Sequence, residues 1–114
     1  MAHIPHYNAA KHGLVGLMRS LANELAPHHI RVNTIHPTNV DTPMFQNPAT
    51  RATVTGRTDA TGQQYAEVAT GMNLLPVPWV ESADITAAAL YLASDDGRYV
   101  TAVTLPVDAG STQR

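Results

Sequence analysis

The fold class is indicated by residues 7–37, which read YNAAKHGLVGLMRSLANELAPHHIRVNTIHP. Apolar side chains recur at intervals of three and four residues across 7–26, which predicts a helix with one buried face. The members of that face are Leu14, Leu17, Met18, Leu21, Ala22 and Leu25. Pro27 ends the helix, and the β-branched, alternating pattern of 30–36 predicts a strand. A helix followed at once by a strand is half of an α/β unit.

The pattern changes after this stretch. Residues 37–61 mix Pro, Thr, Asn and Gly with few apolar anchors, which predicts a long loop with short helical turns. A weaker helical pattern covers 62–72, where apolar residues share one face. The remaining predicted elements are a helix over 82–94, with Ser82 as its N-cap, and a strand over 102–107. We interpret residues 1–114 as a single partial domain.

Composition excludes several classes of function. The 114 residues carry 7 basic and 9 acidic side chains, a net charge of −2 without clusters, so we expect no nucleic-acid partner and no anionic membrane surface. The absence of cysteine excludes a disulfide framework and a thiol nucleophile. Six histidines are present, but no Glu stands at ligand spacing from those near the N-terminus, and we expect no metal site. No signal peptide or membrane-spanning run is evident, so a cytoplasmic location is expected.

A tyrosine and the single lysine of the chain lie four residues apart in the first predicted helix. Tyr7 and Lys11 therefore share one helix face. Ionising a phenol at neutral pH costs about 4 kcal/mol. An ammonium about 5 Å away, at an effective dielectric constant of about 20, offsets about 3 kcal/mol of that cost. The pair can thus act as a general acid or base; the alternative is a solvated pair on a helix surface.

These residues are part of a wider resemblance. YNAAKHGLVGLMRSLANELAPHHIRVNTIHP resembles the Tyr-x-x-x-Lys helix and the following strand of the short-chain dehydrogenase/reductase family, and SADITAAALYLASDDGRYVTAVTLPVDAG resembles its last helix and closing strand. HPTNVDTPM, LPVPWVESADI and TLPVDAGST are similar to the mycofactocin-coupled, or carveol-dehydrogenase-like, branch. The resemblance implies an α/β fold: the C-terminal part of a doubly wound Rossmann-type parallel sheet, without the N-terminal dinucleotide-binding strands.

The resemblance also implies roles for individual residues. Tyr7 would exchange a proton with an alcohol or carbonyl oxygen, and Lys11 would promote ionisation of the phenol and bind the nicotinamide ribose. Cofactor contacts would also come from Pro37, Thr38, Val40 and Thr42, the last two holding the nicotinamide carboxamide. Thr38 departs from the glycine that is common at its position in the wider family. Residues 45–75 would form a substrate lid.

The glycine-rich phosphate-binding turn of the family has no counterpart, because no Gly-x-Gly occurs among the seven glycines. We therefore expect an NAD-dependent oxidoreductase of alcohols or ketones, with NADP as the alternative cofactor, in the form of a truncated chain. The resemblance further implies a homo-oligomer. The competing hypothesis is a non-catalytic remnant that acts only by associating with itself or with a full-length relative.

Overall fold

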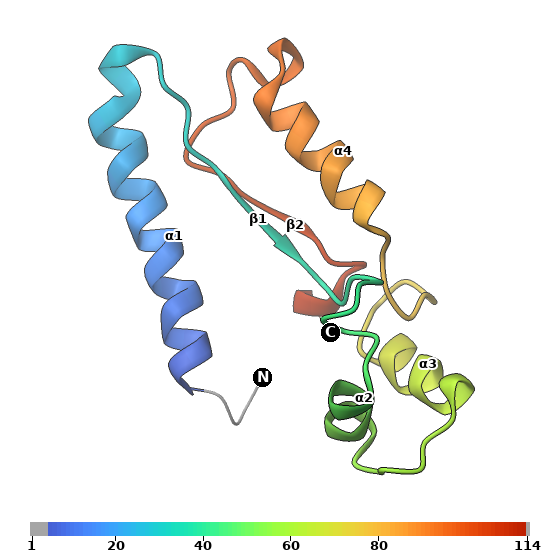
Figure 1. Ribbon diagram of the computed structural model, residues 1–114. Helices are drawn as coiled ribbons and strands as arrows, with labels where there is room; N and C mark the ends of the chain where they lie inside the picture. The colour runs from blue at the N-terminus through green and yellow to red at the C-terminus, as the bar shows by residue number, and fades with distance from the viewer. Residues whose placement is uncertain (1–4, 114) are drawn as a thin grey trace. The chain divides into compact units, whose positions relative to one another are not determined.

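The computed structural model describes residues 5–113, which form an α/β structure of helices and one small sheet. The elements are α1 (Pro5–Leu25), β1 (Thr34–Pro37), α2 (Pro48–Thr55), α3 (Gly62–Gly71), α4 (Ser82–Ala93) and β2 (Thr104–Val107), labelled in Figure 1. Short 3-10 turns follow α1, α4 and β2. The chain divides into two compact units: one holds the chain up to Ile35 with Tyr91–Leu105, and the other holds His36–Leu90 with the chain from Pro106 onward.

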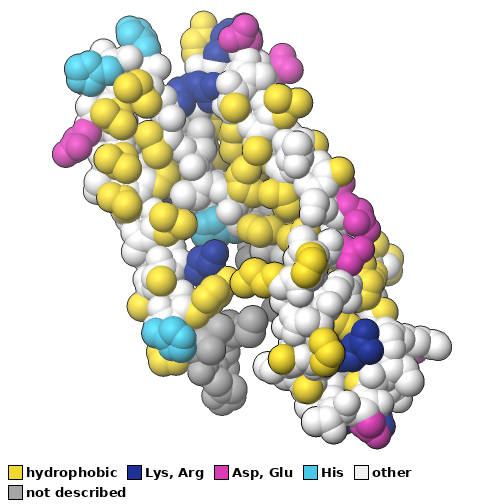
Figure 2. Space-filling view, viewed as in Figure 1, with side chains coloured by type: hydrophobic (Ala, Val, Ile, Leu, Met, Phe, Trp, Pro, Cys, Tyr) yellow, Lys and Arg dark blue, Asp and Glu magenta, His cyan; other side chains and the backbone are white. Residues whose placement is uncertain are grey.

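Helix α1 is less buried than its sequence pattern predicts. Met18 and Ala22 are each 3% exposed, but Leu14 and Leu17 keep 49% and 55% of their surface in solvent. Figure 2 shows hydrophobic side chains along the outer surface of this helix. A spacing of three and four residues identifies the apolar face but not how far a neighbour covers it, and only part of this face is covered.

The helix ends one residue earlier than predicted. Pro27 is not the residue that ends the α-helix; it lies within a 3-10 turn, Ala26–His28, that follows Leu25. His29 closes this turn in the left-handed conformation, with φ 58°, and its N–H donates to the carbonyl of Ala26 at 3.0 Å. Proline is acceptable here because the first residues of a helical turn need no N–H donor.

The two strands are parallel neighbours (Figure 1). The N–H of Thr34 donates to Val103 at 3.0 Å and the N–H of Thr38 donates to Val107 at 3.2 Å, so the register advances in the same direction on both strands. The predicted strands 30–36 and 102–107 are both longer than those observed. Just before the strands, the carboxamide of Asn33 takes the place of the main-chain acceptor for Val103: its nitrogen donates to Val100 and its oxygen accepts from the Val103 N–H, both at 3.0 Å. The Ala102 N–H still donates to the Val32 carbonyl at 2.8 Å.

An arginine ties the end of α4 to the segment before β1. The guanidinium of Arg31 donates to the carbonyls of Leu92, Val100 at 3.3 Å and Ser94 at 3.4 Å. Carbonyls at a helix C-terminus have no partner within the helix, so a forked cation is well suited to satisfy them. The residue pattern gives no sign of this contact, because its partners lie more than 60 positions from Arg31 in the chain.

Residues predicted as a loop contain a helix. Asn47 caps α2 by accepting from the Thr50 N–H at 2.8 Å, Pro48 occupies the first turn, and Gly56 ends the helix with φ 71°. This order of cap, proline and closing glycine is a helix signal. The small number of apolar residues in the segment obscured that signal in the sequence. The short helical turns predicted within 37–61 therefore include a regular helix over 48–55.

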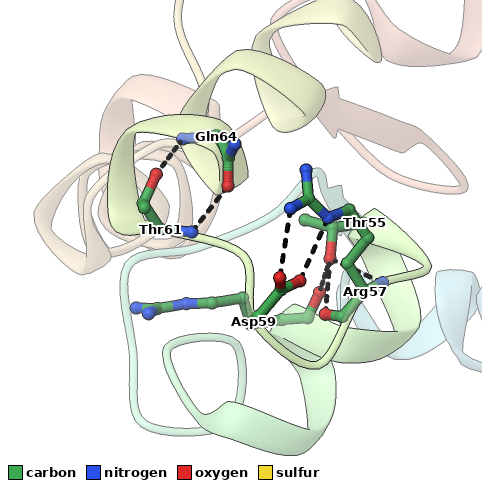
Figure 3. A network of polar contacts seen from close by, with 6 residues as sticks. Thr55, Arg57, Asp59, Thr61 and Gln64 are labelled. Atoms are coloured by element: carbon green, nitrogen blue, oxygen red, sulfur yellow. Dashed lines mark hydrogen bonds and ion pairs between the residues drawn. The ribbon is translucent and has the colours of Figure 1, made fainter.

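The predicted helix over 62–72 is observed as α3. Thr61 and Gln64 form a reciprocal capping box, drawn in Figure 3: the Thr61 hydroxyl accepts from the Gln64 N–H at 3.1 Å and the Gln64 side chain accepts from the Thr61 N–H at 2.8 Å. Before it, Arg57 and Asp59 pair at 3.1 Å, which raises the pKa of the guanidinium and lowers that of the carboxyl through their hydrogen bond. Both side chains are exposed, so the pair contributes little to stability.

Helix α4 begins differently from the prediction. Ser82 is the first helical residue rather than the N-cap, and Asp84 accepts from the Glu81 N–H at 2.9 Å.

Among the described residues, no helix combines the length and hydropathy needed to cross a bilayer.

Candidate functional site

The predicted acid/base pair lies on the first turns of α1. The ammonium of Lys11 is 5.2 Å from the centroid of the Tyr7 ring. Tyr7 is 43% exposed, so its phenol is accessible to a ligand while it lies beside a positive charge. His12, the next residue, instead contacts its own helix, with Nδ1 2.8 Å from the Asn8 carbonyl. An accessible phenol next to an ammonium can exchange protons with an oxygen of a bound molecule.

The predicted cofactor-binding turn, residues 37–42, directly follows β1. It pairs with residue 80 through a single parallel bridge between Val40 and Val80. The N–H of Val80 donates to the carbonyl of Asn39 at 2.9 Å, and the N–H of Asp41 donates to the carbonyl of Val80 at 2.8 Å. This side of the turn is thus occupied by main-chain hydrogen bonds.

The opposite side of the turn presents polar groups. At this parallel bridge Val80 makes both hydrogen bonds, to the residues on either side of Val40. The N–H and carbonyl of Val40 itself therefore point away from Val80. The hydroxyl of Thr42 donates to this carbonyl at 3.4 Å, which places it on the same side. A donor, an acceptor and a hydroxyl on one side of this turn match a primary carboxamide, which has one acceptor oxygen and an NH₂ donor. The residues present therefore fit the nicotinamide end of a dinucleotide.

A buried asparagine supports the start of this turn. The hydroxyl of Thr38 donates to Oδ1 of Asn73 at 3.0 Å, and Nδ2 of Asn73 donates to the carbonyl of Val77 at 2.7 Å. Asn73 is 1% exposed. Sequence analysis did not select this residue, because nothing in its neighbourhood distinguishes a buried asparagine from a loop asparagine.

Segment 45–75 is organised around three aromatic rings. Phe45 stacks on Tyr65 with centroids 5.0 Å apart, and Trp79 lies 6.0 Å and 5.9 Å from these two rings. The Tyr65 hydroxyl donates to the Phe45 carbonyl at 2.6 Å, and burial raises the pKa of Tyr65. The guanidinium of Arg51 lies 5.5 Å from the Tyr65 ring centroid. Trp79 thus packs against Phe45, which precedes α2, and against Tyr65 of α3.

The structure places the selected residues in two groups. Tyr7 and Lys11 belong to the unit that contains α1, whereas Pro37, Thr38, Val40 and Thr42 belong to the other. Pro37, the last residue of β1, is exposed. Asp108, which could be mistaken for a catalytic acid, accepts hydrogen bonds from the Gly110 and Thr112 N–H groups and the Thr112 hydroxyl, as expected for a turn.

Comparison with known proteins gives the family. Residues 1–112 match the family model described as Enoyl-(Acyl carrier protein) reductase. The chain is 54% identical over 112 residues to (-)-trans-carveol dehydrogenase of Rhodococcus erythropolis, a match that covers 97% of this chain and 40% of that enzyme. The chain therefore spans about two-fifths of the length of this relative.

Solved structures agree with this assignment. Carveol dehydrogenase from Mycobacterium avium in complex with NAD superposes with a TM-score of 0.90 at 50% identity, over 96% of this chain and 40% of that one. A short chain dehydrogenase from Mycobacterium paratuberculosis bound to NAD gives a TM-score of 0.76 at 44% identity, over 96% of this chain and 39% of that one. These neighbours confirm the predicted fold class, part of a Rossmann-type α/β sheet. The chain belongs to the short-chain dehydrogenase/reductase family.

Proposed function

We propose that this chain forms the nicotinamide and substrate side of an NAD-dependent alcohol dehydrogenase or carbonyl reductase, with NADP as the alternative cofactor. The observation that carries the proposal is the Tyr7 and Lys11 pair, with the ammonium 5.2 Å from an accessible phenol ring. The NAD complexes of its structural relatives support the choice of cofactor. A cytoplasmic location and a small alcohol or ketone as substrate are parts of the same proposal.

In this proposal Tyr7 handles the proton of the reaction. For oxidation, the phenolate oxygen accepts the proton of the substrate hydroxyl as the carbon–hydrogen bond breaks and a carbonyl forms. Bound NAD supplies the acceptor for the hydride that leaves that carbon. In the reverse direction the phenol returns the proton to the carbonyl oxygen. Lys11 stabilises the phenolate because its ammonium remains beside the ring in both directions.

The 37–42 turn would orient the nicotinamide. The Val40 N–H would donate to the carboxamide oxygen, while the carboxamide NH₂ would donate to the Val40 carbonyl or the Thr42 hydroxyl. Pro37 and Thr38 lead into this turn from β1. Because the 114 residues contain no Gly-x-Gly, the proposal assigns them the reacting end of the cofactor and not its pyrophosphate.

In the first test the purified chain is titrated with NADH, and binding is monitored by fluorescence. Circular dichroism establishes that the chain is folded. We expect saturable binding, and turnover of (-)-trans-carveol, used as a probe alcohol, that falls about 100-fold or more in Tyr7→Phe. Tyr99→Phe is the matched control, since Tyr99 is 88% exposed and lies outside the site. A folded chain without saturable NADH binding, or unchanged turnover in Tyr7→Phe, would refute the proposal.

A second candidate function is association through α1, either between two copies or with a full-length relative. Leu14 and Leu17 expose about half of their surfaces, and a Cβ added at Gly13 or Gly16 would meet nothing within 4 Å. Large exposed apolar patches are typical of interaction surfaces. Sedimentation velocity would show an oligomer that Leu17→Glu dissociates; a monomer at all concentrations would count against this function.

A further inference from the structure

We infer that Asn73 is a positioning residue that joins the lid, residues 45–75, to the carboxamide-binding turn, residues 37–42, through the hydroxyl of Thr38. This inference rests on the proposed function, because only a cofactor at the turn gives the linkage a role in catalysis. The hydrogen bond between Thr38 and Asn73 is 3.0 Å long and connects residues 35 positions apart in the chain.

Asn73 is suited to this task by its burial. Its side chain is 1% exposed, so its amide group depends on partners within the protein. One end accepts from Thr38 and the other donates to the carbonyl of Val77 at 2.7 Å. Because water does not reach a side chain this deeply buried, the Thr38 contact cannot be exchanged freely for a contact with water.

The segment around Asn73 is held firmly on its other side. The N–H groups of Leu74 and Leu75 both donate to the carbonyl of Ala109 at 2.9 Å. Gly110 adopts φ 82°, and a Cβ at this position would lie 2.6 Å from the Leu74 Cβ. The end of the lid is thus packed against the turn that follows β2, and Asn73 projects from a fixed base.

Thr38 transmits this position to the groups that would meet the carboxamide. Its N–H donates to Val107 at 3.2 Å, and it lies two residues before Val40, whose N–H and carbonyl face away from Val80. The main chain is therefore held at 38 by the sheet and at 39 and 41 by residue 80. The hydroxyl of Thr38 adds a side-chain hydrogen bond from this turn to Asn73, near the end of the lid.

The linkage requires the hydroxyl of Thr38. Glycine would leave Asn73 without its hydroxyl donor, whereas threonine supplies it. Movement of the lid and placement of the nicotinamide would then be coupled, so a change at either partner should be felt at the other.

The test measures amide hydrogen exchange in the full chain and NADH affinity in parallel. Thr38→Val removes the hydroxyl and keeps the side-chain shape, Thr38→Ser keeps the hydroxyl, and Asn73→Ala removes the acceptor. In Thr38→Val we expect the Asp41 N–H to exchange about five-fold faster and NADH to bind about five-fold more weakly, the effect of one hydrogen bond. Thr38→Ser should stay within about two-fold of the unsubstituted chain.

Each outcome decides a separate point. Equal exchange at Asp41 in Thr38→Val and Thr38→Ser would overturn the positioning role, and so would faster exchange throughout α1, since that indicates general destabilisation. If the unsubstituted, folded chain binds no NADH, the proposed function fails, but the exchange data still decide whether Asn73 positions the turn. If Asn73→Ala does not fold, the comparison of the two Thr38 variants decides alone.

Discussion

Removing the hydroxyl of Tyr65 should destabilise the aromatic cluster formed by Phe45, Tyr65 and Trp79. Tyr65 is 1% exposed, and its hydroxyl donates to the Phe45 carbonyl at 2.6 Å. Tyr65→Phe keeps the ring contact with Phe45, at 5.0 Å between centroids, but leaves a carbonyl in a partly buried place without this donor. The loss of a hydrogen bond that leaves a buried acceptor unpaired costs about 1–3 kcal/mol. We expect the free energy of unfolding to fall by about 2 kcal/mol.

The same residue predicts a loss of stability in alkali. Burial raises the pKa of Tyr65, and the nearby positive charge of Arg51 only partly opposes this effect. Because the folded state favours the neutral phenol more than the unfolded chain does, the contribution of Tyr65 to the free energy of unfolding is complete below the ordinary pKa of about 10. This contribution disappears as pH rises through the pKa of the folded state. Tyr65→Phe lacks this group, so its stability should depend less on pH above about 10.

Urea unfolding followed by far-UV circular dichroism, at pH 7 and at a series of alkaline pH values, measures both effects. Tyr99→Phe serves as the control, since Tyr99 is 88% exposed, and it should change the free energy of unfolding by less than about 0.5 kcal/mol. The reasoning is refuted if the two variants unfold at the same urea concentration at neutral pH, or if Tyr65→Phe loses stability in alkali as steeply as the unsubstituted chain.

Three further substitutions test other parts of the structure by thermal and urea unfolding. The hydrogen bond from the Thr112 hydroxyl lowers the pKa of Asp108, so the stabilising contribution of this carboxylate is present above the ordinary pKa of about 4 and is lost as pH falls through the pKa of the folded state. Asp108→Asn should be about 1 kcal/mol less stable at pH 7, and its stability should depend less on pH in acid. An equal dependence of stability on acid pH in the variant and the unsubstituted chain would contradict this. Gly110→Ala should cost about 2 kcal/mol or more, because φ is 82° and the new Cβ would meet Leu74; an unchanged melting temperature would disprove the crowding. Arg31→Lys loses the forked contacts with three carbonyls and should cost about 1 kcal/mol, whereas equal stability would show these contacts to be dispensable.

Local features of the sequence were sufficient for part of the structure. The position of α1 follows from its three- and four-residue spacing, and the shared face of Tyr7 and Lys11 follows from helix geometry alone. The turn at Asp108 and Gly110 was likewise expected, because it depends on the conformational freedom of glycine and on hydrogen bonds within five residues. These properties depend on residues close together in the chain, and a single sequence contains that information.

Contacts between distant residues required the tertiary structure. The sequence could not show that α1 leaves Leu14 and Leu17 exposed, that Arg31 binds carbonyls more than 60 positions away, or that the Asn33 carboxamide takes the place of the main-chain acceptor for Val103. Burial and long-range hydrogen bonds depend on which segments meet, and residue spacing contains no record of that.

The candidate site likewise depends partly on residues close together in the chain and partly on contacts between distant segments. The sequence by itself determined that Tyr7 lies beside Lys11, since helix periodicity alone brings the two residues to one face. Only the tertiary structure decided which side of the 37–42 turn is occupied by main-chain hydrogen bonds, because these bonds involve Val80 in a distant segment. It also decided that Asn73 holds Thr38, because a side chain becomes a support only when folding buries it beside its partner.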